Sequence, residues 1–312
     1  MGRVGLYAGA GVAFVVAVVL AAVGAGEATG ALTDWQALVL GVVQGLTEFL
    51  PISSSGHLIL VPWAADWTYL EANDEFNQTF DVALHLGTLV AAVLYFWREI
   101  GELVRAFVAS VRSRSISTPT ERAAWFVAVA TVPALFAGGL GERFIADHLG
   151  EPWQIAILLA GFAMLLWFAD RRPTDVVLET MSFRDAIVIG VAQMLALAPG
   201  VSRSGVTITA ARFLRLDRDS AARFSFLLLI PVTLGAVVYK GVSDVLLADL
   251  PPGSTGPFVV GTLAAAASGI FAIGALLGYV RRHTYTAFVI YRLIAAAIVL
   301  LLIETGVRSA GF

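Results

Sequence analysis

The sequence predicts an all-α, polytopic membrane protein, and three observations lead to this fold class. First, 58% of the 312 residues are hydrophobic and only 14% are charged, whereas about a quarter of the residues in soluble domains are charged. Second, the apolar residues form long runs of the kind that cross a bilayer as helices. Third, arginines gather in some connections between these runs and acidic residues in others, as the positive-inside rule requires.

Charge and cysteine content exclude several classes of function. The net charge of -3 is too small to indicate a nucleic acid or another strongly charged partner. The absence of cysteine rules out disulfides, thiolate metal sites and a cysteine nucleophile. We therefore expect membrane lipids, and no nucleic acid, as partners. A homodimer is compatible with the sequence, which does not fix the oligomeric state.

The first apolar segment covers residues 4–26 and is long enough to span a bilayer. Small residues near its end resemble a signal-peptide cleavage site, but the segment is longer than an ordinary signal-peptide core, and only Arg3 precedes it. We therefore favour a retained helix over a cleaved signal peptide. It forms an N-terminal extension, residues 1–33, ahead of a single membrane-embedded domain, residues 34–312.

The distribution of charge orients the segments that follow. Residues 67–81 carry acids and no Lys or Arg, which places them outside, while the connection 98–122 carries five arginines and is placed inside. The spanning helices predicted from this pattern are residues 82–97, 123–140, 153–169, 224–239, 258–280 and 285–303. We thus expect about six core transmembrane helices, plus the extra one at the N-terminus.

Two further apolar runs, residues 35–63 and 186–213, are broken in the middle. Pro-Ile-Ser-Ser-Ser-Gly-His interrupts the first at 51–57, and Pro-Gly-Val-Ser-Arg-Ser-Gly interrupts the second at 199–205. The second run has basic flanks at both ends; if residues 4–26 cross outward, the first run has both ends outside. We therefore predict two re-entrant, broken-helix hairpins that enter from opposite faces.

The two hairpins are also related in sequence. Five residues recur at one constant spacing: Gly41, Gln44, Ser53, Ser55 and Gly56 recur as Gly190, Gln193, Ser202, Ser204 and Gly205. The helices that follow the hairpins match as well. Together with the opposite flanking charge, this indicates two inverted repeats, about residues 34–140 and 183–280, whose broken helices meet near the middle of the membrane.

The breaks themselves favour an anion. Serines after a proline or glycine turn can cap the half-helix that follows, which we expect to begin near Ser54 or Ser55 in the first break and within 202–204 in the second. Free N–H groups at such helix starts attract negative charge. The residues that we expect to bind phosphate here are Ser53, Ser55, Gly56, Ser202, Arg203, Ser204, Gly205 and Thr207.

Four side chains make the predicted site chemically specific. Gln44 and Glu48 are four residues apart and project from one face of the helix that leads into the first break. His57 ends the break, and Arg203 is the only cation in either one, with a planar fork suited to two phosphate oxygens. Together with the two helix starts, these groups predict a site that handles phosphate.

Structural roles for the same residues stay open at this point. Glu48 and Arg203 could form a buried ion pair that only pins the repeats together, and His57 could be a hydrogen-bonded core residue. Serines are more often helix caps than nucleophiles, so Ser54 could be either a cap or the nucleophile. Packing or interhelical hydrogen bonds are the expected role of three residues in neighbouring helices, His85, Thr88 and Thr131.

A family resemblance rests on two stretches of the sequence. Residues 44–57 (QGLTEFLPISSSGH) resemble the first signature of the undecaprenyl pyrophosphate phosphatase family, also called the bacitracin-resistance family, and residues 199–207 resemble its second. The similarity extends from about Asp34 to residues 287–292. Gln44 stands where the family carries Glu or Gln, and Ser55 stands where Thr is frequent.

The resemblance implies an integral enzyme of the plasma membrane with its active site open to the outer face. Such an enzyme removes the terminal phosphate of a long-chain polyprenyl pyrophosphate and so recycles the lipid carrier for cell-wall and other surface glycans. The resemblance also implies a divalent cation, Mg2+ or Ca2+. By matched position, Glu48, His57 and Arg203 are expected to be catalytic, with Ser54 and Thr207 among the phosphate contacts.

The mechanism that we expect places the pyrophosphate on Arg203 and the second helix start, while Glu48, with Gln44 or water, holds the metal. His57 either protonates the leaving phosphate or attacks phosphorus, and Ser54 is the competing nucleophile. The alternative class of function is a transporter or flippase of the polyprenyl phosphate, built on the same inverted repeats. The grouping of Glu48 and His57 beside the phosphate-binding elements favours hydrolysis.

Overall fold

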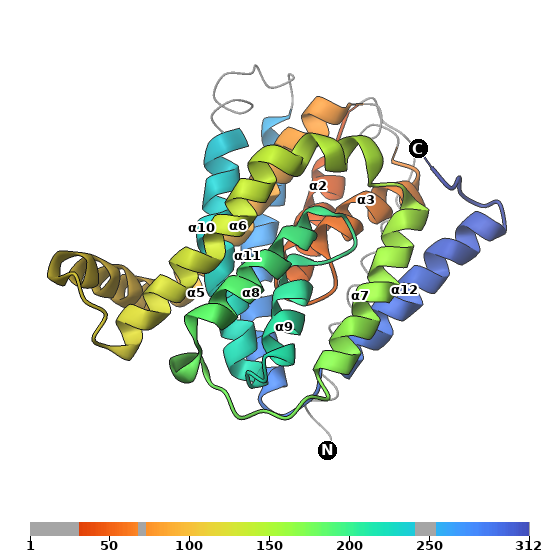
Figure 1. Ribbon diagram of the computed structural model, residues 1–312. Coiled ribbons are helices and arrows are strands. Elements are labelled where there is room, and N and C mark those ends of the chain that lie inside the picture. The colour runs from red at the N-terminus through yellow and green to blue at the C-terminus, as the bar shows by residue number, and fades with distance from the viewer. Residues whose placement is uncertain (1–30, 68–72, 241–253, 312) are drawn as a thin grey trace.

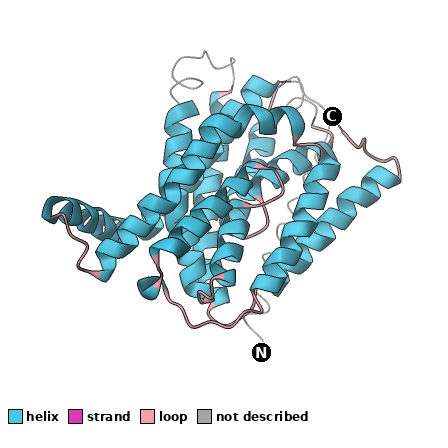
Figure 2. Ribbon diagram, in the orientation of Figure 1, coloured by secondary structure: helices cyan, strands magenta, loops and turns pink. Residues whose placement is uncertain are grey.

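The computed structural model describes residues 31–67, 73–240 and 254–311, which form a bundle of helices (Figure 1). Within these residues, the regular structure comprises ten α-helices, two short 3-10 helices and an isolated bridge between Val176 and Leu216. Figure 2 shows how little of the described chain is loop. The prediction of an all-α fold is confirmed. The helix predicted at residues 4–26 lies outside the described residues.

The helices follow the predicted segments along the chain. In order, they are α2 (Asp34–Phe49), α3 (Ser54–Ala65), α5 (Asp74–Ser113), α6 (Pro119–His148), α7 (Pro152–Ala169), η1 (Leu178–Thr180), α8 (Phe183–Gln193), η2 (Met194–Leu197), α9 (Arg203–Phe213), α10 (Arg218–Lys240), α11 (Thr255–Val280) and α12 (Thr286–Glu304).

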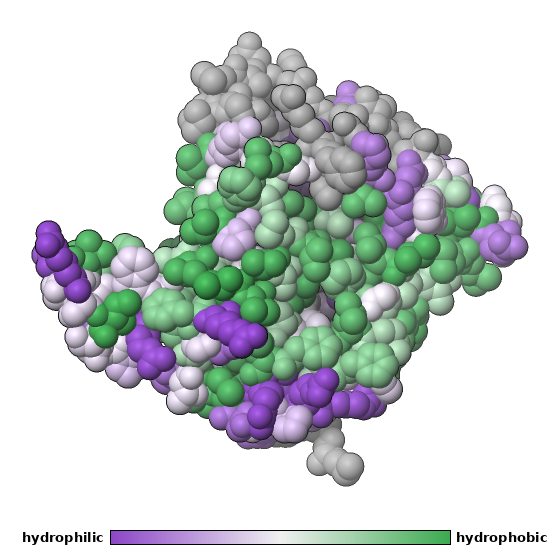
Figure 3. Space-filling model, viewed as in Figure 1, coloured by the Kyte–Doolittle hydropathy of each residue, from purple (hydrophilic) through white to green (hydrophobic). Residues whose placement is uncertain are grey.

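Six of the described helices are long and apolar enough to cross a membrane: α5, α6, α7, α10, α11 and α12. They correspond in order to the six predicted segments, so the expectation of about six core membrane helices is confirmed. Large apolar side chains face outward from them, and Leu94, Phe136 and Phe271 are each more than half exposed. Figure 3 shows this apolar surface around the middle of the molecule, with hydrophilic residues gathered at its lower edge.

Helix α5 is much longer than the span predicted at residues 82–97. It bends at Phe96, whose φ of -102° and ψ of 16° are not helical, and continues to Ser113. Beyond the bend, α5 and the start of α6 project from the bundle as a hairpin arm (Figure 1). The charges that begin at Arg98 end the apolar run but not the helix, because Arg and Glu are good helix formers.

Close helix packing explains why glycine occupies one position in both copies of the sequence repeat, Gly41 and Gly190. A Cβ at Gly41 in α2 would lie 2.3 Å from the Gly261 carbonyl oxygen of α11, and a Cβ at Gly190 in α8 would lie 2.5 Å from the Ala130 carbonyl oxygen of α6. Both repeated positions therefore let a broken helix approach the backbone of a long helix, as small residues do in membrane bundles. This contact holds each broken helix in place beside a spanning one.

The two broken helix pairs, α2 with α3 and α8 with α9, lie among the long helices (Figure 1). The first helix interruption lies between Phe49 and Ser54. The second consists of η2 and the turn that precedes Arg203. Helix breaks at the predicted proline and glycine positions are therefore present. Their entry from opposite faces, the inverted repeats and the domain boundaries stay predictions.

Candidate active site

The two breaks end in the same unusual backbone geometry. Ser53 has φ 78° and ψ 95°, and Ser202 has φ 75° and ψ 115°, a region that side-chain-bearing residues rarely adopt. Each serine caps the helix that follows: Ser53 Oγ accepts from the Gly56 N–H and Ser202 Oγ accepts from the Gly205 N–H. The helices begin at Ser54 and Arg203, within the predicted positions. Backbone strain of this kind costs on the order of 1–3 kcal/mol per residue and clusters at functional sites.

The structure brings the two breaks into direct contact. The Gly200 N–H donates to Ser53 Oγ at 3.1 Å, and Ser204 Oγ donates to the Leu50 carbonyl at 3.0 Å. Arg292, fully buried in α12, joins both: its Nη2 donates to the Gly200 carbonyl at 2.8 Å and its Nη1 to the Pro51 carbonyl at 3.4 Å. A guanidinium with five donors thus satisfies carbonyls that the breaks leave without helical partners.

Glu48 is the centre of the polar cluster. Its Oε1 accepts from Arg203 Nη2 at 2.8 Å, while its Oε2 accepts from Ser54 Oγ at 2.5 Å and from Gln44 Nε2 at 3.2 Å. The Nε2 of His85 lies 3.8 Å from the same Oε2. Glu48 is buried and Arg203 is 13% exposed, so a carboxylate just before the first break and an arginine just after the second form one largely buried ion pair.

Arg203 has a second hydrogen-bond partner besides Glu48. Its Nη1 donates to the Ser225 carbonyl in α10 at 2.9 Å. Thr207 lies one turn further along α9, with its Oγ1 2.7 Å from Ser225 Oγ and 2.8 Å from the Arg203 carbonyl. Thr207 and Ser225 therefore hold the start of α9 against α10, which fixes the direction of the arginine.

His57 has both ring nitrogens engaged. Nδ1 lies 2.6 Å from the Ser53 carbonyl, and Nε2 lies 2.7 Å from the Tyr291 hydroxyl. A carbonyl can only accept, so Nδ1 carries the proton, and in the neutral ring Nε2 accepts from Tyr291. The lone pair that a nucleophilic His57 would need is thus already bonded, whereas Ser54 points its hydroxyl at a carboxylate.

Four of the predicted phosphate contacts lie in the first turns of α3 and α9. Ser54 and Ser55 are half-buried at the start of α3, and Ser54 is in the Glu48 cluster. Gly56 and Gly205 are buried, and their N–H groups bond the capping serines. These two glycines therefore hold the breaks in shape in this structure; their assignment as phosphate contacts stays a prediction.

Three residues of this site were missed or given another role from the sequence. The sequence predicts packing for His85, but His85 lies beside Glu48. The sequence predicts no role in the site for Tyr291 or Arg292, but Tyr291 contacts His57 and Arg292 contacts both breaks. A buried arginine in an otherwise apolar run was an available signal, because such a charge within a membrane helix requires partners.

An amide oxygen beside Glu48 has no partner in the described structure. Gln44 is fully buried, and its Oε1 makes no hydrogen bond, although its Nε2 bonds Glu48. Among the described residues there is no cluster of three or more His, Asp or Glu that could hold a metal ion by itself. Glu48 and Gln44 thus offer one carboxylate and one unpartnered amide oxygen in this cluster.

These contacts define a class of protein: a helical, multi-pass membrane protein whose two interior helix breaks together hold a buried carboxylate, a hydroxyl and an arginine. A model of the family described as bacitracin resistance protein BacA matches residues 37–298, and the chain belongs to this family.

The chain also matches curated relatives over nearly the whole length of those proteins. An undecaprenyl-diphosphatase of Gemmatimonas aurantiaca is 44% identical over 269 residues, which is 86% of this chain and 97% of that protein. Undecaprenyl-diphosphatases of Geobacter sulfurreducens and Geobacter metallireducens are 44% and 45% identical over 85% and 86% of this chain, and over 96% and 97% of their own length.

Proposed function

We propose that this chain is a membrane phosphatase that hydrolyses a long-chain polyprenyl pyrophosphate to the monophosphate and orthophosphate. The names of its relatives and their nearly complete coverage support this function. The observation in the structure that carries it is the Ser54 hydroxyl, bonded to Glu48 on the carboxylate whose other oxygen holds Arg203. A nucleophile, its base and a phosphate-binding cation thus lie within one hydrogen-bonded unit.

In the proposed reaction, Ser54 Oγ attacks the terminal phosphorus and gives its proton to Glu48. The bond from phosphorus to the bridging oxygen breaks, the polyprenyl monophosphate leaves, and water then releases orthophosphate from the serine. Arg203 stabilises the charge on the transferring phosphoryl oxygens, which is the main requirement of phosphoryl transfer. His57, bonded at both nitrogens, positions the start of α3 rather than attacking phosphorus.

A divalent cation, Mg2+ or Ca2+, fits the donor set of this site. Glu48 and the unpartnered Oε1 of Gln44 would hold it, and Mg2+ is commonly bound by one or two carboxylates together with substrate phosphates. When bound, the cation would neutralise part of the pyrophosphate charge. The chain itself supplies the nucleophile and the arginine.

The proposed setting is the plasma membrane, with the site open to the outer face and the prenyl chain lying between helices. The arginine-rich connections support this orientation, because they mark the inner side. Membrane lipids and the polyprenyl substrate are the expected partners. The homodimer stays a prediction.

The function is tested by orthophosphate release from undecaprenyl pyrophosphate with the purified protein in detergent. We expect multiple turnovers, suppressed by a chelator and restored by added Mg2+ or Ca2+. Detergent micelles have no two compartments, so turnover also separates a phosphatase from a transporter or flippase of the polyprenyl phosphate. A stably folded preparation that releases no orthophosphate would reject the proposal.

A further inference from the structure

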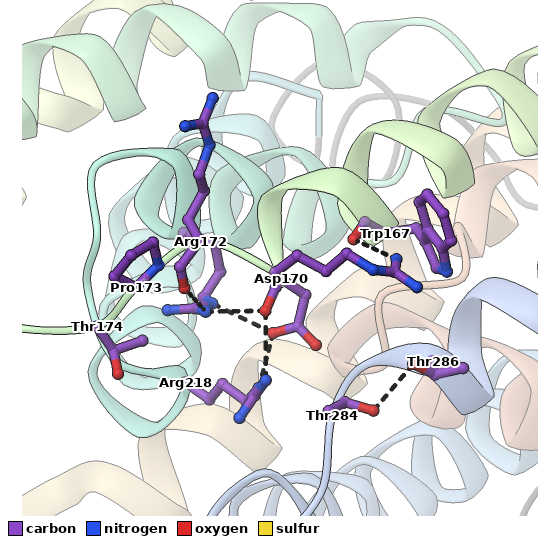
Figure 4. Close-up of a pocket in the computed structure, with 10 residues that line it drawn as sticks. Trp167, Asp170, Arg172, Pro173, Thr174, Arg218, Thr284 and Thr286 are labelled. Atoms are coloured by element: carbon purple, nitrogen blue, oxygen red, sulfur yellow. Dashed lines mark hydrogen bonds and ion pairs between the residues drawn. The ribbon is translucent and has the colours of Figure 1, made fainter.

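A polar cavity lies away from the paired breaks, where α7 ends and α12 begins (Figure 4). Its volume is about 370 Å³. Four arginines and one aspartate line it: Arg171, Arg172, Arg212, Arg218 and Asp170. The cavity therefore carries a formal excess of three positive charges.

Asp170 bonds two of the arginines that line this cavity. Its Oδ1 accepts from Arg212 Nε at 3.2 Å and from Arg218 Nε at 2.7 Å, and its Oδ2 accepts from the Tyr285 N–H at 2.9 Å. Arg212 is fully buried, and its remaining nitrogens donate to the carbonyls of Asp170, Arg172 and Leu216. One acid is thus compensated by two arginines, which ties the ends of α7 and α9 to the starts of α10 and α12.

The other two arginines are not needed for that compensation. Arg171 is exposed, with its guanidinium carbon 3.2 Å from the centre of the Trp167 ring and one Nη1 bond to the Trp167 carbonyl. Arg172 is exposed, its side chain extends away from the Asp170 carboxylate (Figure 4), and it makes no side-chain bond within the described residues. Both retain N–H groups that an incoming anion can use.

The position of the cavity indicates where that anion comes from. Two membrane-spanning helices meet there, since the span of α7 ends at Ala169 and that of α12 begins at Thr286. Phe168 is 53% exposed, and its neighbour Trp167 is of a residue type enriched at the boundary between lipid tails and head groups. The arginines mark this end as the inner side, where anionic lipids give the membrane surface a negative potential.

We propose that this cavity binds the phosphate head group of an anionic lipid of the inner leaflet. Arg218 offers its Nη1, which has no bond among the described residues, and the exposed residues Thr284 and Thr286 also line the cavity. The side chains of Arg171 and Arg172 extend to different sides of the cavity in Figure 4, and in the proposal both turn toward the phosphate oxygens when the lipid binds. The acyl chains lie along α7 beside Phe168. Basic pockets between membrane helices at the inner surface recognise lipid head groups in this way.

The test is lipid binding by the delipidated full chain in a neutral detergent. Dihexanoyl phosphatidylglycerol is titrated, and bound lipid is counted by native mass spectrometry. We expect one tightly bound phosphatidylglycerol and markedly weaker binding of dihexanoyl phosphatidylcholine, which has no net charge. The double variant R171Q/R172Q should bind phosphatidylglycerol about 30-fold more weakly. Each basic residue near an anionic lipid contributes about 1 kcal/mol of binding free energy, and the loss of two such contributions corresponds to this factor.

The matched control is R112Q/R114Q, which removes two exposed arginines from the hairpin arm, outside the cavity. It should bind phosphatidylglycerol as the unmodified protein does, and R171K/R172K, which keeps the charge, should retain most of the binding. If R171Q/R172Q does not fold, R171Q and R172Q are measured singly and should each weaken binding several-fold.

Three results would overturn the proposal. These are unchanged phosphatidylglycerol binding in folded R171Q/R172Q or in both single variants, equal binding of phosphatidylcholine, and displacement of the lipid by equimolar inorganic phosphate. The last result would assign the cavity to a soluble anion.

Discussion

Glu48 shows how single residues join the two breaks. It is buried, and each of its oxygens has partners, with Arg203 on one and Ser54 and Gln44 on the other. A buried ion pair is costly to break, because the remaining charge loses its partner without regaining water. The proposed catalytic residues therefore also contribute to stability, and substitutions must be chosen to separate the two effects.

Arg203→Ala should lower kcat/KM for orthophosphate release by about 10³-fold or more, as expected when a phosphoryl-stabilising arginine is lost. It should also cost about 3–5 kcal/mol of stability, because Glu48 is left unpaired. The control is E48Q/R203A, which removes both charges. Thermal unfolding in detergent should show that this double variant regains stability while its activity stays lost; wild-type turnover in Arg203→Ala would contradict the role.

Ser54→Ala should abolish trapping of a phosphorylated enzyme after acid quenching of a reaction with substrate labelled in the terminal phosphate. Turnover should fall by about 10³-fold or more, as for loss of a nucleophile that acts with a base. Ser55→Ala is the comparison: it removes a predicted phosphate contact but leaves the Ser54 hydroxyl bonded to Glu48, so a phosphorylated enzyme should still be trapped even where turnover falls. A phosphorylated His57 in the unmodified enzyme would assign the nucleophile differently.

At the scale of helices, the site is held by backbone contacts. Gly41 brings α2 against α11, Gly190 brings α8 against α6, and Arg292 of α12 bonds carbonyls of both breaks. Such close approach is required because broken helices leave polar backbone groups at membrane depth, where no water replaces the missing partner. The same α12 places Tyr291 on His57.

Gly41→Ala should destabilise the protein by about 1–3 kcal/mol, the usual cost of overpacking, because its Cβ would collide with the Gly261 carbonyl oxygen. Gly161→Ala is the matched control: Gly161 lies in the middle of α7, and a Cβ there would meet no atom within 4 Å. That variant should be neutral or stabilising by up to about 1 kcal/mol. The melting temperatures of the two variants are compared in one detergent. Equal values would show that the contact between Gly41 and Gly261 is not tight.

At the scale of the whole molecule, charge sets the proposed orientation, and the lack of cysteine makes it easy to measure. Ser117 lies in the arginine-rich connection and Ala310 follows α12, and both are exposed. In intact cells, a membrane-impermeant maleimide should label Ala310→Cys, and it should label Ser117→Cys only after permeabilisation. The reverse pattern would place the active site on the inner face.

The sequence by itself determined the all-α membrane fold, the six long helices and the starts of α3 and α9. These follow from local properties: apolar runs, proline and glycine breaks, and serines that can cap. It also placed Glu48 and Arg203 in one site, because the internal repeat related the two breaks. The extension of α5 past Phe96 was missed, since charge ends an apolar run without ending a helix.

Only the tertiary structure decided which partners the polar groups have. The sequence could not show that the Nε2 of His57 bonds the Tyr291 hydroxyl, because Tyr291 lies far away in the chain. His85 beside Glu48, and Arg292 across both breaks, likewise depend on which helices become neighbours. A hydrogen bond to a nearby cap is encoded locally, whereas the partner of a buried side chain is set by the packing of distant helices.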